Sequence, residues 1–125
     1  MTRAAARCGW VALAGAVLVS ACGASSQNAA QVNGDAARGR VLLAQYGCGR
    51  CHRIPGVASA NGNVGPPLDG VGRRVYLAGV LPNSPEHMVR WIRSPQSFKP
   101  TTPMPDLNVT EEHATDMVAH LFRLR

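Results

Sequence analysis

The sequence predicts a small all-α domain in which three to five helices and long loops wrap around one bound group. Three helical patterns are present, at residues 34–46, 85–93 and 110–125. The long segments between them are rich in glycine and proline and have no period. A chain of 125 residues also builds only a thin core, so it would gain stability from a bound group.

The first 33 residues are expected to precede the folded domain. Residues 1–21 carry two arginines and then an apolar, small-residue stretch, as a secretory leader does. Its ending, Val19-Ser20-Ala21-Cys22, resembles the lipobox of bacterial lipoproteins, which implies a lipid on Cys22. Residues 22–33 are polar and aperiodic, which is typical of a flexible tether. The domain itself is expected over residues 34–125.

Two alternatives to the lipid anchor are open. Residues 8–24 form an uncharged run near the lower limit for a transmembrane helix, so an uncleaved anchor is one of them. A soluble extracytoplasmic protein is the other. All three versions place the domain outside the cytoplasm.

The first predicted helix has an apolar stripe interrupted by a glycine. Glycine inside a helix costs about 1 kcal/mol relative to alanine, so we expect Gly39 to mark a close crossing with the last helix. The stripe consists of Ala37, Val41, Leu42 and residues 44–46.

The run Cys48-Gly49-Arg50-Cys51-His52 is the attachment pattern of a c-type haem. Two thiols three positions apart can each bond one vinyl group of the porphyrin, and the next residue can bind the iron through its imidazole. A redox dithiol and half of a zinc site are the alternatives. The other two cysteines, Cys8 and Cys22, lie far away in the leader, which disfavours zinc.

Residues 54–72 are expected to form an irregular loop, because they are rich in glycine, proline and asparagine. The segment Gly65-Pro66-Pro67-Leu68 follows the histidine closely. A backbone carbonyl in it could accept the second N–H of His52 and so orient the ring.

The second predicted helix runs from Pro85 to Arg93. Ser84 is a suitable N-cap, and Pro95 stops the helix. We expect Val89 and Ile92 to face inward, with Met88 or Trp91 beside them. The indole N–H of Trp91 needs a buried partner, and a haem propionate is a candidate.

Residues 97–107 contain three prolines and cannot form a regular element. Met104 lies among them, and a methionine in a stiff loop is a better sixth-ligand candidate than Met88 or Met117 on amphipathic helices. His87, His113 and His120 are the alternatives, and any of them would give bis-histidine iron.

The last predicted helix opens at Thr110, an N-cap, and runs toward Arg125. Acidic residues follow the cap and arginines close the helix, in agreement with the helix dipole. Its apolar face comprises Ala114, Met117, Val118, Leu121 and Leu124.

The formal charge of the chain is +6, and it stays positive without the two leader arginines. The basic residues are dispersed and not interleaved with aromatic residues, which disfavours nucleic-acid binding. An acidic face on a protein partner fits better.

Together these residues resemble a class I c-type cytochrome, and the resemblance covers residues 34–125. Within that family the stretch from Gly72 to Pro100 resembles the cytochrome c domain fused to subunit II of caa-type haem–copper oxidases, and here the domain stands alone. Leu43 and His120 depart from the pattern, since aromatic residues are common at both positions. The resemblance implies roles for five residues: a Pro66 carbonyl bound to His52, Leu68 against the haem face, Arg74 and Trp91 toward a propionate, and Thr102 in the ligand loop.

The expected function is one-electron transfer by one haem c per chain, with His52 and Met104 as axial ligands. Electrons are expected to pass at a haem edge near Gly49, Arg50, Arg53 and the loop 99–105. The partners implied are a donor such as a quinol-oxidising complex and an acceptor such as a haem–copper oxidase, in an extracytoplasmic respiratory chain. A haem enzyme or a gas or redox sensor in which the methionine is displaced is the alternative function.

Overall fold

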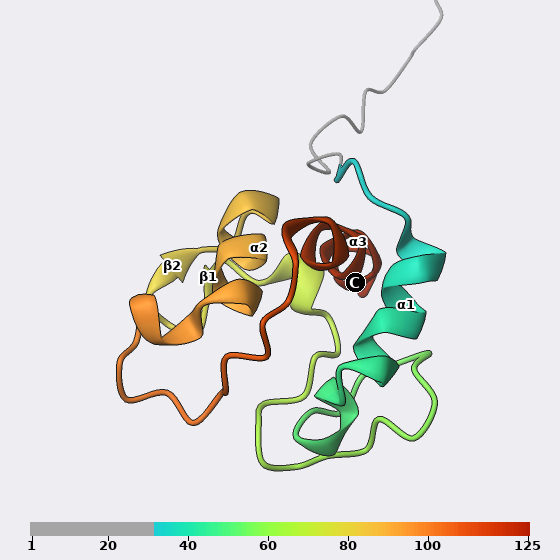
Figure 1. The fold of residues 1–125 in the computed structure, drawn as a ribbon, viewed down its shortest axis with the longest axis horizontal. Helices are drawn as coiled ribbons and strands as arrows, with labels where there is room; N and C mark the ends of the chain where they lie inside the picture. The colour runs from blue at the N-terminus through green and yellow to red at the C-terminus, as the bar shows by residue number, and fades with distance from the viewer. Residues whose placement is uncertain (1–31) are drawn as a thin grey trace, which may run out of the picture.

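The computed structural model describes residues 32–125, and these residues form a mostly helical domain (Figure 1). The small all-α fold expected from the sequence is therefore confirmed. The expectations for the leader, for Cys22 and for nearly all of the tether lie outside the described residues. The helices are α1 (Ala36–Gln45), α2 (Pro85–Arg93) and α3 (Glu111–Leu121); the strands are β1 (Tyr76–Leu77) and β2 (Leu81–Pro82); the 3₁₀ turns are η1 (Cys48–Arg50), η2 (Val71–Arg73) and η3 (Pro95–Ser97).

None of the helices in residues 32–125 combines the length and the apolar character that crossing a membrane requires.

Helix α1 starts at Asp35, whose carboxylate accepts the N–H groups of Ala37 at 2.9 Å and Arg38 at 3.0 Å. These two bonds lower the pKa of the Asp35 carboxyl. The predicted stripe was wrong for most of its residues. Leu42 is buried and Tyr46 is half-buried, but the others are exposed: Ala37, Val41, Ala44 and Gln45. The face that is buried instead consists of Ala36, Gly39, Leu42 and Leu43.

Helices α1 and α3 cross at Gly39, as predicted. A Cβ on Gly39 would overlap the carbonyl oxygen of Asp116 and would lie 2.8 Å from the backbone nitrogen of Met117. Only a residue without a side chain fits this crossing. In Figure 1 the two helices lie side by side.

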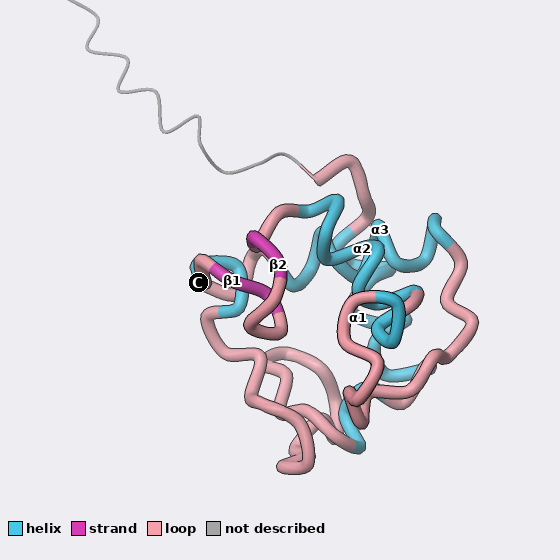
Figure 2. Tube along the Cα trace, turned by 90° about the vertical axis from the view of Figure 1, so that its left-hand side faces the viewer, coloured by secondary structure: helices cyan, strands magenta, loops and turns pink. Residues whose placement is uncertain are grey.

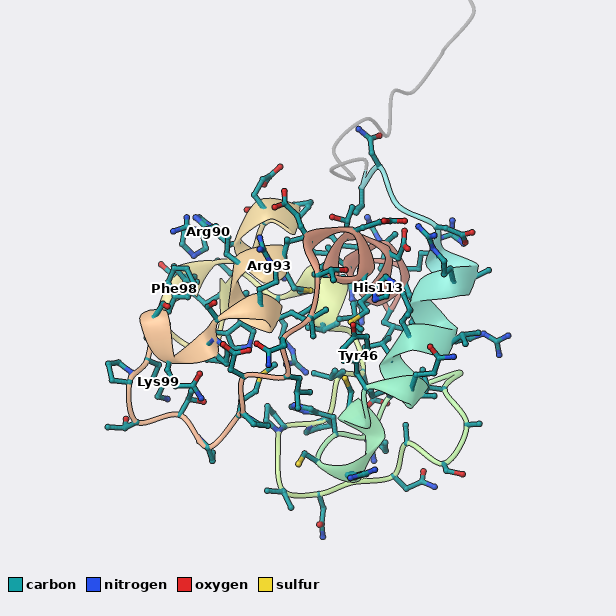
Figure 3. All side chains as sticks on the ribbon, in the orientation of Figure 1. Tyr46, Arg90, Arg93, Phe98, Lys99 and His113 are labelled. Carbon is teal, nitrogen blue, oxygen red and sulfur yellow. The ribbon has the colours of Figure 1, made fainter. Side chains whose placement is uncertain are left out.

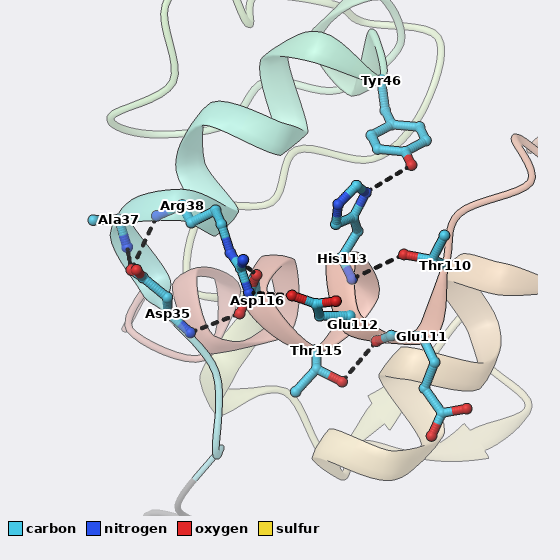
Figure 4. A network of polar contacts seen from close by, with 10 residues as sticks. All are labelled: Asp35, Ala37, Arg38, Tyr46, Thr110, Glu111, Glu112, His113, Thr115 and Asp116. Atoms are coloured by element: carbon cyan, nitrogen blue, oxygen red, sulfur yellow. Dashed lines mark hydrogen bonds and ion pairs between the residues drawn. The ribbon is translucent and has the colours of Figure 1, made fainter.

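Polar contacts around Asp116 secure the same crossing (Figure 4). The Asp116 side chain accepts the backbone N–H of Asp35 at 2.7 Å and a hydrogen bond from Nε of Arg38. The residue is only 3% exposed. A buried carboxylate is stable here because both of its oxygens are hydrogen-bonded.

Helix α2 has the predicted bounds. The Ser84 hydroxyl accepts the N–H of His87 at 3.2 Å and caps the helix. Its buried face consists of Pro85, Met88, Trp91 and Ile92, and it packs against α3. Val89 is half-buried rather than fully inward.

Helix α3 is shorter than predicted and ends at Leu121, with Phe122 as its C-cap. The Thr110 hydroxyl accepts the N–H of His113 at 3.2 Å, as an N-cap does. Four of the five residues of its predicted apolar face, all but Leu124, are buried.

A two-stranded hairpin between η2 and α2 was not predicted (Figure 2). Tyr76 pairs with Pro82, and Leu77 pairs with Leu81. Ala78 and Gly79 form the turn with φ angles of 52° and 75°, a left-handed pair that matches the twist of a tight hairpin. Strands of two residues are too short for an alternating pattern to show in the sequence.

Candidate functional site

A cavity of about 620 Å³ lies at the centre of the domain and is bordered by residues from all three helices, the hairpin and the loops. Its volume is within the range of roughly 300–1,000 Å³ that is typical of ligand and cofactor sites. The nine residues that we expect from the sequence to bind the haem all border it: Cys48, Cys51, His52, Pro66, Leu68, Arg74, Trp91, Thr102 and Met104.

The two cysteines reach the cavity from one tight turn. The turn begins at Gly47, which has a φ of 73°. The N–H of His52 donates a hydrogen bond of 3.0 Å to the Cys48 carbonyl and closes the turn. Neither thiol of Cys48 and Cys51 is in a disulfide. Burial raises the pKa of the Cys48 thiol, which disfavours the thiolate that a redox dithiol uses as its nucleophile.

The His52 ring is held by a backbone carbonyl. Its Nδ1 lies 2.7 Å from the carbonyl oxygen of Pro66, and because a carbonyl only accepts, Nδ1 donates. Nε2 is then the unprotonated nitrogen that can bind a metal. A Cβ on Gly65 would lie 2.7 Å from Nδ1, so the glycine lets the loop approach the ring. This is the orientation expected of a metal-binding imidazole.

Only His52, among the four histidines of the chain, all of which lie in the described residues, borders the cavity. His87 pairs its Nδ1 with the Pro82 carbonyl at 2.9 Å. His120 has a buried Nε2 without a partner within residues 32–125, and burial lowers its pKa. Bis-histidine ligation would therefore need a rearrangement of this fold.

Met104 borders the cavity from the segment between η3 and α3. Its N–H donates to the Thr102 hydroxyl at 3.3 Å, and its carbonyl accepts a hydrogen bond from Nε2 of Gln96 at 2.7 Å. Met88 and Met117 also border the cavity, but they are 1% and 0% exposed and belong to the packed core. The sequence assigned Gln96 no role of its own, because its hydrogen bond to a carbonyl eight residues away depends on how the loop folds back.

Arg74 and Trp91, which the resemblance places toward a propionate, both border the cavity. The Arg74 guanidinium donates to the carbonyls of Pro67 and Asp69, the latter at 3.2 Å. Trp91 is 9% exposed, and its indole N–H has no hydrogen-bond partner within residues 32–125. An acidic group on a bound molecule would therefore find both a cation and a free donor at this wall.

Positive charge gathers at the cavity. Arg50, Arg74 and Lys99 border it, and no aspartate or glutamate of residues 32–125 does. Asp69, five residues before Arg74 in the sequence, forms an ion pair with Arg53 at 3.0 Å. Figure 3 shows Lys99 on the loop that follows η3.

Tyr46 is a cavity residue that the sequence indicated only as part of an apolar stripe. Its hydroxyl lies 2.9 Å from Nδ1 of His113, and the two rings meet edge to face with centroids 5.8 Å apart (Figures 3 and 4). The hydroxyl links the end of α1 to the first turn of α3. The hairpin residues Tyr76 and Leu77 also border the cavity, and no sequence signal pointed to them.

Comparison with known proteins gives one distant relationship. No protein-family model matches the chain. The chain is 34% identical over 89 residues to cytochrome c oxidase subunit 2 of Alkalihalophilus pseudofirmus. The match covers 70% of this chain and 25% of that protein, so the chain spans about a quarter of the length of its curated relative. The chain is thus related in sequence to one part of an oxidase subunit.

Proposed function

We propose that this protein is a one-electron carrier with one haem c, which Cys48 and Cys51 would attach and His52 and Met104 would ligate. The observation that carries the proposal is the convergence of these four side chains on one cavity. The cavity has the size of a cofactor site, and the Nδ1 of His52 is already occupied by the Pro66 carbonyl. These residues fit the group.

Each residue has a defined task in this proposal. Cys48 and Cys51 anchor the ring through thioethers, and His52 presents Nε2 because Nδ1 is held. Met104 offers a soft thioether, which favours the reduced iron. The haem, when bound, supplies one reversible ferric–ferrous couple.

Much of the remaining wall is aliphatic. Leu43, Leu68, Val71, Leu77 and Leu121 border the cavity with aliphatic side chains. An apolar wall disfavours the extra positive charge of the oxidised state and raises the potential. With histidine and methionine both bound, no open position is left for a substrate, so we propose a carrier and not an enzyme.

A redox partner with an acidic surface suits this protein, because Arg50 and Lys99 stand at the cavity without an acidic neighbour there. Since the relative is an oxidase subunit, we infer that the acceptor is a terminal haem–copper oxidase and that the donor is a quinol-oxidising complex. The location inferred is extracytoplasmic, at a membrane, through a lipid on Cys22.

The test begins with the full chain produced in a host that exports it and attaches haem. We expect haem to remain with the polypeptide after denaturation, one-electron redox behaviour, and the methionine-to-ferric-iron charge-transfer band. Cys48→Ala with Cys51→Ala should abolish covalent attachment, whereas Met104→Ala should remove the band and keep the attachment. A bis-histidine spectrum would contradict Met104, and carbon monoxide binding to the reduced native protein would favour a sensor or an enzyme.

The partner and the anchor need separate measurements. Membranes containing the oxidase should oxidise the reduced protein, and an oxidase inhibitor should stop them. Insensitivity to the inhibitor would remove the oxidase as the direct acceptor. Mass spectrometry of the mature protein should find a lipid on Cys22 at the N-terminus, and an N-terminus at Met1 would exclude that anchor.

A further inference from the structure

The segment 100–108 carries Met104 and has few polar ties to the rest of the fold. Among residues 32–125, a single hydrogen bond joins it to an element that precedes Lys99, and this bond runs from Nε2 of Gln96 to the carbonyl of Met104 at 2.7 Å. Its other hydrogen bonds connect residues two or three positions apart: Thr102 N–H to the Lys99 carbonyl, Met104 N–H to the Thr102 hydroxyl, and Asn108 N–H to the Asp106 carboxylate.

The backbone around Gln96 is held by burial and by hydrogen bonds. It lies in η3, directly after α2, and the side chain of Pro95 beside it is fully buried. The N–H groups of Phe98 and Lys99 both donate to the Pro95 carbonyl, at 3.2 and 3.0 Å. The Arg90 guanidinium then covers the Phe98 ring, 4.9 Å from its centroid (Figure 3). The backbone that carries the amide donor is therefore anchored to α2.

Two hydrogen bonds restrain the backbone on the two sides of the Met104 Cα. The Thr102 hydroxyl holds the N–H and Gln96 holds the carbonyl, so both peptide groups that set the direction of the side chain are restrained. Pro103 and Pro105 flank the methionine and restrict the chain further. Gln96 itself is exposed and is not among the residues that border the cavity, so it acts through Met104.

We propose that Gln96 is a positioning residue that keeps Met104 at the cavity and sets how often the sixth ligand leaves the iron. This inference rests on the function proposed above. An external ligand binds only when the methionine has left, so its apparent affinity scales with the open fraction. Loss of one hydrogen bond should raise that fraction about 2- to 10-fold.

Imidazole binding to the ferric, haem-loaded protein measures the open fraction. Gln96→Ala removes the side-chain amide, and Gln96→Glu keeps its shape but has no N–H to donate at neutral pH. Both variants should bind imidazole about 2- to 10-fold more tightly than the wild type. Ser97→Glu is the charge control, since Ser97 is exposed, adjacent and without a side-chain hydrogen bond within residues 32–125; it should bind as the wild type does.

The outcomes separate the positioning role from other roles. If both Gln96 variants keep the wild-type imidazole affinity while the wild type has the methionine charge-transfer band, the positioning role is overturned and the proposed function stands. Tighter binding in Gln96→Ala alone would mean that packing, not the donor, matters, and this also overturns the inference. A merely structural glutamine would lower the unfolding midpoint with no change in affinity. A wild type without the band would overturn the proposed function itself.

Discussion

Gly39 of α1 lies directly against the backbone of Asp116 in α3, and a Cβ at position 39 would overlap the Asp116 carbonyl oxygen. The same Asp116 holds the start of α1 through the backbone N–H of Asp35. One short stretch of α3 therefore determines both where α1 begins and how close it approaches. Leu43, one turn later on α1, and Met117 both border the cavity, so the crossing positions part of the cavity wall.

Gly39→Ala should destabilise the haem-loaded protein by about 1 to 3 kcal/mol, because the new methyl group must push the helices apart. In an open helix the same change would stabilise by about 1 kcal/mol, so the sign of the effect reports the crossing. The measurement is the free energy of unfolding in urea. Val41→Ala, on the exposed side of α1, should change it by about 0.5 kcal/mol or less. A Gly39→Ala protein as stable as the wild type would contradict the close approach.

The stability of the protein should fall in mild acid through His120. Burial, with added repulsion from Arg40 and Arg123, lowers the pKa of His120, although the backbone near Pro55 and Ala36 opposes the shift. The unfolded chain takes up a proton at this residue near pH 6.5, whereas the folded protein takes it up only at lower pH. The contribution of neutral His120 to the free energy of unfolding is thus complete above about pH 6.5 and is lost as the pH falls below this value.

Urea unfolding of the wild type and of His120→Phe at several pH values checks this expectation. The variant has no titratable group at position 120, so the difference in unfolding free energy between the two proteins should change as the pH falls below about 6.5. A difference that is constant across this range would show that His120 titrates equally in both states.

Gly65→Ala should reduce the yield of haem-loaded protein. The added methyl group would lie 2.7 Å from Nδ1 of His52, so it must displace either the ring or the loop that carries Pro66. Either movement weakens the hydrogen bond that orients the imidazole. The ratio of haem to polypeptide in the purified protein is the measurement. Asn63→Ala, at an exposed neighbouring residue that does not border the cavity, is the control and should load normally.

Under the proposed function, electron transfer to an acidic partner should depend on salt through Lys99. Lys99→Glu should lower the second-order rate several-fold at about 0.01 M salt, where the Debye length is about 30 Å, and much less at about 1 M, where it is about 3 Å. Stopped-flow oxidation of the reduced protein measures the rate. Arg40→Glu makes the same charge change on α1, away from the cavity, and should have a smaller effect. Equal effects of the two variants would show that net charge alone governs the rate.

Local signals account for the elements that were predicted well. Helix α2 has the expected bounds because its start and stop, Ser84 and Pro95, act within one or two turns. The last helix was predicted too long because its apolar pattern continues to Leu124. In the structure the N–H groups of Arg123 and Leu124 bond the carbonyls three residues back, at 3.0 and 3.1 Å, so a tight turn replaces the regular helix after Leu121. The Leu124 carbonyl then accepts the N–H of Gly72 at 3.0 Å, a contact across more than fifty residues.

The orientation of α1 shows where composition misleads. Val41 is apolar and was placed inward, yet it is 48% exposed, whereas Gly39 has no side chain and is buried. The close crossing turns the face of α1 that carries Gly39 toward α3. The packing gained there outweighs the burial of Val41. The free-energy cost of a glycine inside a helix indicated the crossing. It did not indicate which face of α1 the crossing would bury.

The sequence by itself determined the features that depend on near neighbours: the spacing of Cys48, Cys51 and His52, the caps of the helices, and the proline-stiffened segment around Met104. The tertiary structure alone decided which distant side chains meet. It excluded three histidines from the cavity, added Tyr46 and the hairpin to its wall, and brought Gln96 to the Met104 carbonyl. The reason is physical: backbone dihedral preferences and capping act over a few residues, whereas membership of a cavity depends on how separate helices and loops pack together.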